Sequence, residues 1–129
     1  MQGEGFKQIV AWQKGYQLSL DVYKATSGFP TSETYGLVSQ MRRAAVAVPA
    51  NIAEGYNRQH RKEYLQFLSV ANGSLAELET YLLLARDLGY LKPETFDGLS
   101  QLHKNVARIM HGLLKSLRSP DPIPLTLDP

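Results

Sequence analysis

An unbroken apolar heptad runs through the middle of this sequence and limits the folds open to it. Between residues 61 and 88, apolar side chains recur at alternating spacings of four and three residues. On an α-helix this spacing forms the narrow seam by which antiparallel helices pack. The seam consists of Tyr64, Leu68, Ala71, Leu75, Leu78, Leu82 and Ala85. The pattern predicts a long helix that needs other helices to cover it.

Three further segments carry helical periodicity, and glycine or proline separates each segment from the next. Glycine just past a helix end and proline just inside the next helix are the expected punctuation. The expected helices cover residues 7–26, 33–54, 61–88 and 94–117. The other apolar stripes are Ile9, Trp12, Tyr16, Leu20 and Tyr23 in the first helix, Val38, Met41, Ala45, Val48 and Ile52 in the second, and Leu99, Leu102, Val106, Ile109, Leu113 and Leu117 in the last.

These helices predict an all-α fold, an antiparallel up-down-up-down four-helix bundle over residues 1–118. The alternative is a two-hairpin unit that completes its core only in an oligomer. Because the apolar period continues past Pro49, we expect a kink there rather than a helix end. We expect Trp12 to be substantially buried. Residues 119–129 hold four prolines in eleven positions, which predicts an extended, mobile tail.

Composition places the chain among ordinary globular proteins. Its 129 residues suit one domain, and 43% of them are hydrophobic. Cysteine is absent, which excludes disulfides and thiolate metal sites. No apolar run approaches the roughly 20 residues that a membrane helix needs, and no signal peptide is recognisable. We therefore expect a cytoplasmic protein.

The sequence contains no arrangement of residues typical of an active site. Glu-x-x-His pairs, which di-iron bundles require, are missing, and so are a Gly-x-Ser-x-Gly elbow and a phosphate-binding glycine loop. The histidines are His60, His103 and His111, and the last two are expected to be exposed. We therefore predict no catalytic residue, no metal site and no cofactor.

Basic residues follow one face of the last expected helix. They recur at spacings of four and three and fall within an arc of about 80°. One-signed stripes match the electrostatic footprint of phosphate binding, whereas a merely solvated face usually mixes signs. The stripe consists of Lys104, Arg108, His111, Lys115 and Arg118. A second basic group, between residues 40 and 62, consists of Arg42, Arg43, Arg58, Arg61 and Lys62 with one acidic residue, Glu54.

A second apolar row lies beside the heptad seam of residues 61–88. A helix in a monomeric bundle normally offers one apolar face to the core. The second row therefore predicts a subunit interface and a homo-oligomer. The alternative is that Phe67 and Tyr81 merely flank the core. The row consists of Phe67, Val70, Tyr81, Leu84 and Leu88, and Ser74 and Glu77 interrupt it.

Asn51 and Glu54 lie one turn apart near the end of the second expected helix, where a carboxylate opposes the helix dipole. We interpret them as a structural polar pair. Asn51 would serve backbone groups freed at Pro49, and Glu54 would pair with Arg58 or Arg61 or cap the next helix. A ligand site is the alternative interpretation.

Several short motifs lie in register between residues 12 and 91: Trp12-Gln13-Lys14, Tyr35-Gly36-Leu37, Gln40-Met41-Arg42-Arg43-Ala44-Ala45, Pro49-Ala50-Asn51-Ile52-Ala53-Glu54-Gly55, Gly73-Ser74-Leu75-Ala76-Glu77-Leu78-Glu79 and Gly89-Tyr90-Leu91. Together they resemble the four-helix-bundle proteins of the 23S rRNA intervening-sequence type, and the last helix matches in character only. Arg42 and Arg43 match the family's paired arginines, and Asn51 and Glu54 match its polar pair. The family usually places Ser or Thr where His60 stands, so Asn57 or His60 must cap the third helix here.

The resemblance implies a bacterial protein, encoded within an rRNA gene or as a free-standing gene, with no established activity. A related branch is the accessory variability determinant of diversity-generating retroelements. It forms a five-membered ring and works with a reverse transcriptase and RNA through basic surfaces. The resemblance therefore implies a pentamer and a reverse transcriptase as a candidate partner. It supplies no catalytic residue.

Three functions are open at this point. The basic stripe favours a non-enzymatic, oligomeric protein that binds RNA or another nucleic acid. The second apolar row is also compatible with a protein-interaction scaffold, for example a partner of a reverse transcriptase, that does not touch nucleic acid. The missing active-site residues disfavour the third possibility, an enzyme of unrecognised type.

Overall fold

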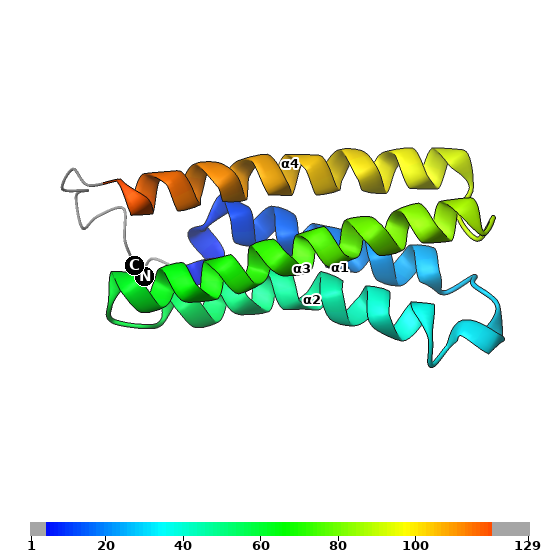
Figure 1. Cartoon of the computed structure of the whole chain (residues 1–129), viewed down its shortest axis with the longest axis horizontal. Coiled ribbons are helices and arrows are strands. Elements are labelled where there is room, and N and C mark those ends of the chain that lie inside the picture. The colour runs from blue at the N-terminus through cyan, green and yellow to red at the C-terminus, as the bar shows by residue number, and fades with distance from the viewer. Residues whose placement is uncertain (1–4, 120–129) are drawn as a thin grey trace.

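The computed structural model describes residues 5–119, and all of its regular elements are helical. Two short 3₁₀ helices, η1 and η2, accompany four long α-helices (Figure 1). This confirms the predicted all-α, four-helix fold. The predicted tail, apart from Ser119, lies outside the described residues. The elements are η1 (Gly5–Gln8), α1 (Val10–Thr26), η2 (Thr31–Glu33), α2 (Leu37–Tyr56), α3 (Arg61–Asp87) and α4 (Pro93–Arg118).

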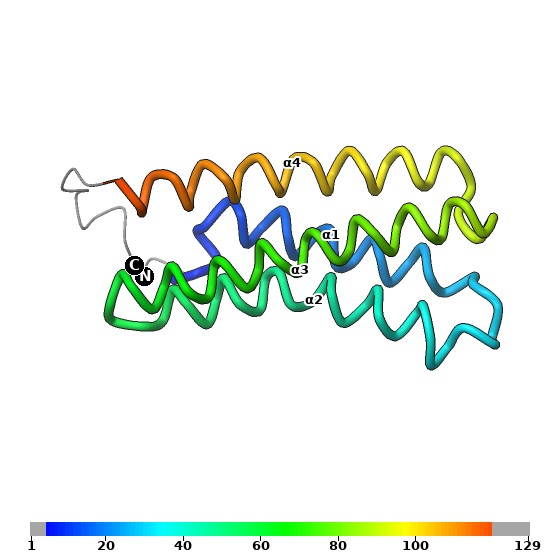
Figure 2. Tube along the Cα trace, in the orientation of Figure 1, coloured from blue at the N-terminus to red at the C-terminus, as the bar shows by residue number. Residues whose placement is uncertain are grey.

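The four helices occupy the corners of a square in cross-section. α2 contacts α1 and α3, α4 contacts the same two helices, and within the described residues α2 and α4 do not touch. α2 and α4 are therefore diagonal, as the trace in Figure 2 also indicates. α1 and α2 run in opposite directions: Gly15 of α1 lies beside Val48 of α2, while Thr26 lies beside Arg42.

The stripes predicted for α2 and α3 form the centre of the core. Every residue of both stripes is less than 9% exposed, and most are completely buried. α3 therefore uses its seven-residue seam as the sequence indicates. Gly55, near the end of α2, allows the closest approach to α3, because an added Cβ there would lie 2.7 Å from the Cβ of Phe67.

The stripe predicted for the first helix is wrong at three of its five residues, since only Ile9 and Trp12 pack against the core. Tyr16, Leu20 and Tyr23 are 48%, 41% and 45% exposed, whereas α1 turns its smaller side chains to the core. The physical reason is close packing, because a Cβ on Gly15 would already lie 3.2 Å from Val48 Cγ1. The buried residues of α1 are Ala11, Gly15, Leu18, Ser19, Val22 and Thr26.

Trp12 is partly buried and packs against the core, in line with the burial expected for it. Its ring stacks on Tyr16, with centroids 5.0 Å apart, and meets the edge of Phe6 at 5.2 Å. The indole therefore packs within an aromatic cluster at the flank of the bundle, partly against the core.

The core face of α4 is rotated slightly from the predicted stripe. Leu99, Val106 and Leu117 are buried as predicted, together with His103, Met110 and Leu114, while Leu102, Ile109 and Leu113 are half-buried. The expectation that His103 is exposed is therefore wrong. Its Nε2 atom lies 2.6 Å from the carbonyl oxygen of Leu75, so a protonated Nε2 donates a hydrogen bond that joins α4 to α3.

α2 continues through Pro49 without interruption, and the bend expected there stays a prediction. Proline lacks an N–H group, so the Ala45 carbonyl loses its usual helical partner. The Ser19 hydroxyl of α1 lies 2.9 Å from this carbonyl and donates to it. Asn51 also serves the backbone of α2, because its Nδ2 donates to the Ala47 carbonyl at 2.7 Å rather than to the Ala45 carbonyl.

Glu33 ties together the connections at one end of the bundle. Its Oε1 accepts a bond from the Leu37 backbone N–H at 3.1 Å, which caps α2. Its Oε2 accepts a bond from the Tyr90 hydroxyl, 3.0 Å away in the α3–α4 connection. This hydrogen bond to the carboxylate raises the pKa of Tyr90.

We predict that Ser19→Ala lowers the free energy of unfolding by about 1–3 kcal/mol, because it leaves a buried carbonyl without a donor. In a Pro49→Ala background the same substitution should cost much less, since the N–H of residue 49 then bonds to Ala45. Denaturant unfolding of the four proteins measures this coupling. Ser27→Ala, which removes an exposed hydroxyl, is the control. Equal costs of Ser19→Ala in both backgrounds would contradict the assignment.

Candidate nucleic-acid interface

The basic stripe predicted on the last helix lies on the surface of α4. Lys104, Arg108, His111, Lys115 and Arg118 are all exposed. They extend along about 20 Å of helix, at a rise of 1.5 Å per residue. Asp97 lies two turns before Lys104 on the same face, so the stripe has a single sign from Lys104 onward.

The C-terminal end of the stripe borders a shallow hollow of about 590 Å³. His111, Lys115 and Arg118 line it together with Leu114 and Ser119. Arg118 also reaches α3, where its guanidinium donates to the Ser69 hydroxyl at 3.3 Å. Three basic side chains thus converge here, and hydroxyl and apolar groups lie among them. Such a surface offers hydrogen-bond donors and positive charge to a phosphate group.

Arg58, Arg61 and Lys62 lie at the α2–α3 turn, at the same end of the bundle as the C-terminus of α4 (Figure 1). Arg58 is paired with Glu54 at 2.9 Å, and its guanidinium lies 5.0 Å from the centre of the Phe67 ring. Arg58 is one of the two ion-pair partners expected for Glu54. Lys62 is exposed, whereas Arg61 is half-buried.

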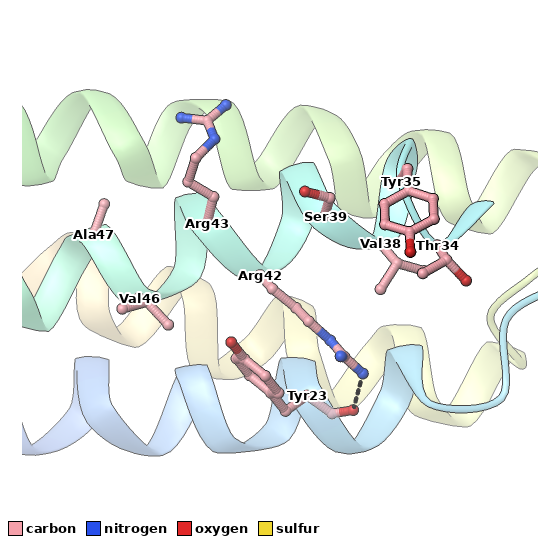
Figure 3. A pocket seen from close by; sticks show the side chains of 9 residues that line it. All are labelled: Tyr23, Thr34, Tyr35, Val38, Ser39, Arg42, Arg43, Val46 and Ala47. Atoms are coloured by element: carbon pink, nitrogen blue, oxygen red, sulfur yellow. Dashed lines mark hydrogen bonds between the residues drawn. The ribbon is translucent and has the colours of Figure 1, made fainter. Parts of the chain in front are cut away.

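Arg42 and Arg43 are adjacent in sequence but occupy different surroundings (Figure 3). Arg42 crosses to α1, where it donates to Thr26 Oγ1 at 2.9 Å and to the Tyr23 carbonyl at 3.3 Å. Its guanidinium also lies over the Tyr23 ring, 4.4 Å from the centroid. Arg43 extends to the other side of α2, is exposed, and donates to Gln40. Arg42 therefore holds the end of α1, and Arg43 is the more accessible of the two.

Both arginines line a hollow of about 620 Å³ that no part of the sequence analysis predicts. Its wall is apolar apart from the arginines and the hydroxyl groups of four residues, one of which, Tyr35, is 95% exposed. The exposed rings of α1 are the sequence signal for this surface, but their spacing led them to be assigned to the core. The lining residues are Tyr23, Thr34, Tyr35, Val38, Ser39, Arg42, Arg43, Val46 and Ala47.

The second apolar row predicted on the third helix is only partly covered. Val70, Leu84 and Leu88 are 55%, 46% and 50% exposed, whereas Phe67 and Tyr81 are half-buried. Three members of the row therefore project into solvent, as residues of an interface would in a separated subunit.

Other kinds of site find no support in the described part of the chain. Among residues 5–119, no three His, Cys, Asp or Glu side chains are grouped so that they could bind a metal ion. No helix in this range combines the length and the hydropathy required to cross a membrane.

Comparisons with known proteins agree with this fold. The sequence profile of the 23S rRNA-intervening sequence protein family matches residues 7–112. A crystal structure from Bacteroides thetaiotaomicron, described as a protein of unknown function from the S23 ribosomal protein family, superposes with a TM-score of 0.76. The two chains are 18% identical, and the match covers 82% of this chain and 96% of the other. Comparison with curated proteins gives no match.

We predict that Arg42→Gln lowers the free energy of unfolding by about 1–2 kcal/mol, because it removes two hydrogen bonds from a charged donor and a cation–π contact. Arg43→Gln, which makes the same chemical change at the next position, should alter stability by less than about 0.5 kcal/mol. Urea unfolding of the two variants compares them directly. Equal destabilisation by the two substitutions would contradict the assignment of the stabilising contacts to Arg42.

Proposed function

Because the chain belongs to the 23S rRNA-intervening sequence protein family, we propose that it is a non-enzymatic, cytoplasmic homo-oligomer that binds RNA. The observation that carries this proposal is the exposed stripe of α4, Lys104, Arg108, His111, Lys115 and Arg118. Each long side chain can neutralise a phosphate without reading a base. Such binding has little sequence preference and weakens strongly with salt.

The oligomer is part of the proposal because one copy attracts a polyanion weakly. Its formal net charge is only +2, and at physiological salt the Debye length is about 8 Å. Assembly multiplies the charge and places several α4 stripes on one particle. The exposed row of Val70, Leu84 and Leu88 supports such an assembly. The proposed number of copies, five, rests on the family resemblance alone.

Arg58, Arg61 and Lys62 extend the proposed interface beyond α4, whereas Arg43 lies on α2, the helix diagonal to α4. Arg58, Arg61 and Lys62 lie at the end of the bundle where Arg118 contacts α3. One strand of RNA along α4 can therefore continue across this end. Arg42 is assigned a smaller part, because its guanidinium is already engaged with α1.

A protein-interaction scaffold, with a partner such as a reverse transcriptase, is the second candidate function. The observation that favours it is the extent of exposed apolar surface on α1 and α3. It predicts no RNA binding by the purified protein, and that outcome separates the two functions.

We predict that replacing Lys104, Arg108, Lys115 and Arg118 with Gln weakens binding to mixed RNA and leaves the oligomer intact. The slope of log K against log salt should flatten by up to about 3, at roughly 0.7 for each lost contact with a single strand. Filter binding at several salt concentrations measures both effects, and light scattering measures the mass.

A matched control replaces Lys7, Lys14, Lys24 and Lys92, four exposed lysines outside the stripe, with Gln. Both variants lose four positive charges, so a difference between them reports the position of the charge. Equal weakening would show that RNA binding depends on the number of positive charges and not on their position in the stripe. A wild-type protein that ignores RNA at low salt would rule out the RNA-binding proposal and leave the scaffold.

A further inference from the structure

One side of the bundle, formed by α1 and α2, exposes apolar side chains around a hollow. Tyr16, Leu20 and Tyr23 of α1 are 48%, 41% and 45% exposed, and Val46 of α2 is 41% exposed. Beside them lies the hollow of about 620 Å³ with Tyr35 at its margin. Large aromatic and aliphatic side chains grouped in this way, with arginine among them, are typical of the centre of a protein interface.

The neighbouring side of the bundle, formed by α2 and α3, carries apolar side chains that project. Val70, Leu84 and Leu88 are about half exposed, and Tyr81 lies on the same face of α3. Glu77 shares this face and is exposed. The first side is therefore hollowed, and the second carries projecting apolar side chains, which we call the α3 ridge.

The charges of the two sides are complementary. Arg42 and Arg43 line the hollow, and no carboxylate lines it. Arg42 is engaged with α1, so the exposed Arg43 is the cation that remains available there. The ridge carries Glu77, which forms no ion pair within residues 5–119, and α3 has no lysine or arginine between residues 63 and 80. A carboxylate flanked by apolar side chains meets its best partner in an apolar hollow that is lined by guanidinium groups.

We propose that the α1–α2 hollow of one copy of this chain receives the α3 ridge of a second copy. This inference deepens the proposed homo-oligomer by assigning the surface that covers the α3 row. The contact is heterologous, because the two copies contribute different surfaces. An open chain of copies keeps one free hollow at one end and one free ridge at the other until the assembly closes.

The position of α2 determines how successive copies are oriented. Both surfaces border α2, so they lie on neighbouring sides of the square rather than on opposite sides. Each added copy is therefore turned relative to the one before it. A repeated turn in one plane closes into a ring, whereas contacts on opposite sides extend into a filament.

Two exposed substitutions test the contact by complementation. Leu20→Lys damages the hollow side and leaves the ridge intact, and Leu84→Lys does the reverse. Each variant alone should have the mass of one chain, 14.4 kDa, by light scattering. An equimolar mixture should contain a particle of twice that mass and nothing larger, because only one intact hollow can meet one intact ridge. Leu83→Lys, on another face of α3 at 39% exposure, is the control and should keep the wild-type mass.

Other outcomes overturn the inference in distinguishable ways. If Leu20→Lys keeps the wild-type mass, the ridge pairs with another surface, such as a second ridge. If Leu20→Lys keeps its mass and loses affinity for RNA, the hollow is an RNA site. If both variants are monomeric but do not combine, the two surfaces do not meet. A monomeric wild-type protein would contradict the proposed homo-oligomer. It would not decide RNA binding by α4, because that is measured separately. Circular dichroism of each variant confirms that it is folded.

Discussion

The hydrogen bond from the Ser19 hydroxyl to the Ala45 carbonyl is the contact on which the register of the bundle depends. Pro49 frees that carbonyl within the core, where an unpaired acceptor is costly. The observed position of α1 along α2 brings the Ser19 hydroxyl to it. The same position places Gly15, the residue with the least bulk, beside Val48. A slip of one turn would leave the carbonyl unpaired and press a larger side chain against α2.

This register also determines which surface the protein shows. Since Ala11, Gly15 and Ser19 take the side of α1 that faces α2 and the core, the larger residues Tyr16 and Leu20 lie on the flank. The exposed apolar side of α1 and α2 is thus a consequence of close helix packing. α3 also exposes apolar side chains, but for a different reason: it carries a second apolar row that its own bundle does not cover. α2 consequently lies between two apolar sides, and α4 keeps a charged one.

The sequence was a good guide wherever a stripe of large side chains coincided with the core. That condition holds for α2 and α3, where every residue of the predicted stripes is buried. It fails for α1, where periodicity selected the largest apolar residues, Tyr16 and Tyr23, although close packing required the smallest. It fails again at His103, whose burial depends on a carbonyl of another helix. The positions of the α4 stripe follow from helical spacing alone. The hollow near Arg42 depends on how α1 and α2 pack together, and the spacing of residues along one helix carries no information about that packing.

The diagonal arrangement of α2 and α4 has a consequence for the path of a bound strand. If copies join through the two sides that border α2, α2 faces the axis of the assembly and α4 faces outward. RNA held by α4 then winds around the perimeter, and no end has to be threaded through a pore. Internal stretches of a long transcript are accessible to such a particle. The length of RNA protected from nucleases would grow with the circumference of the ring.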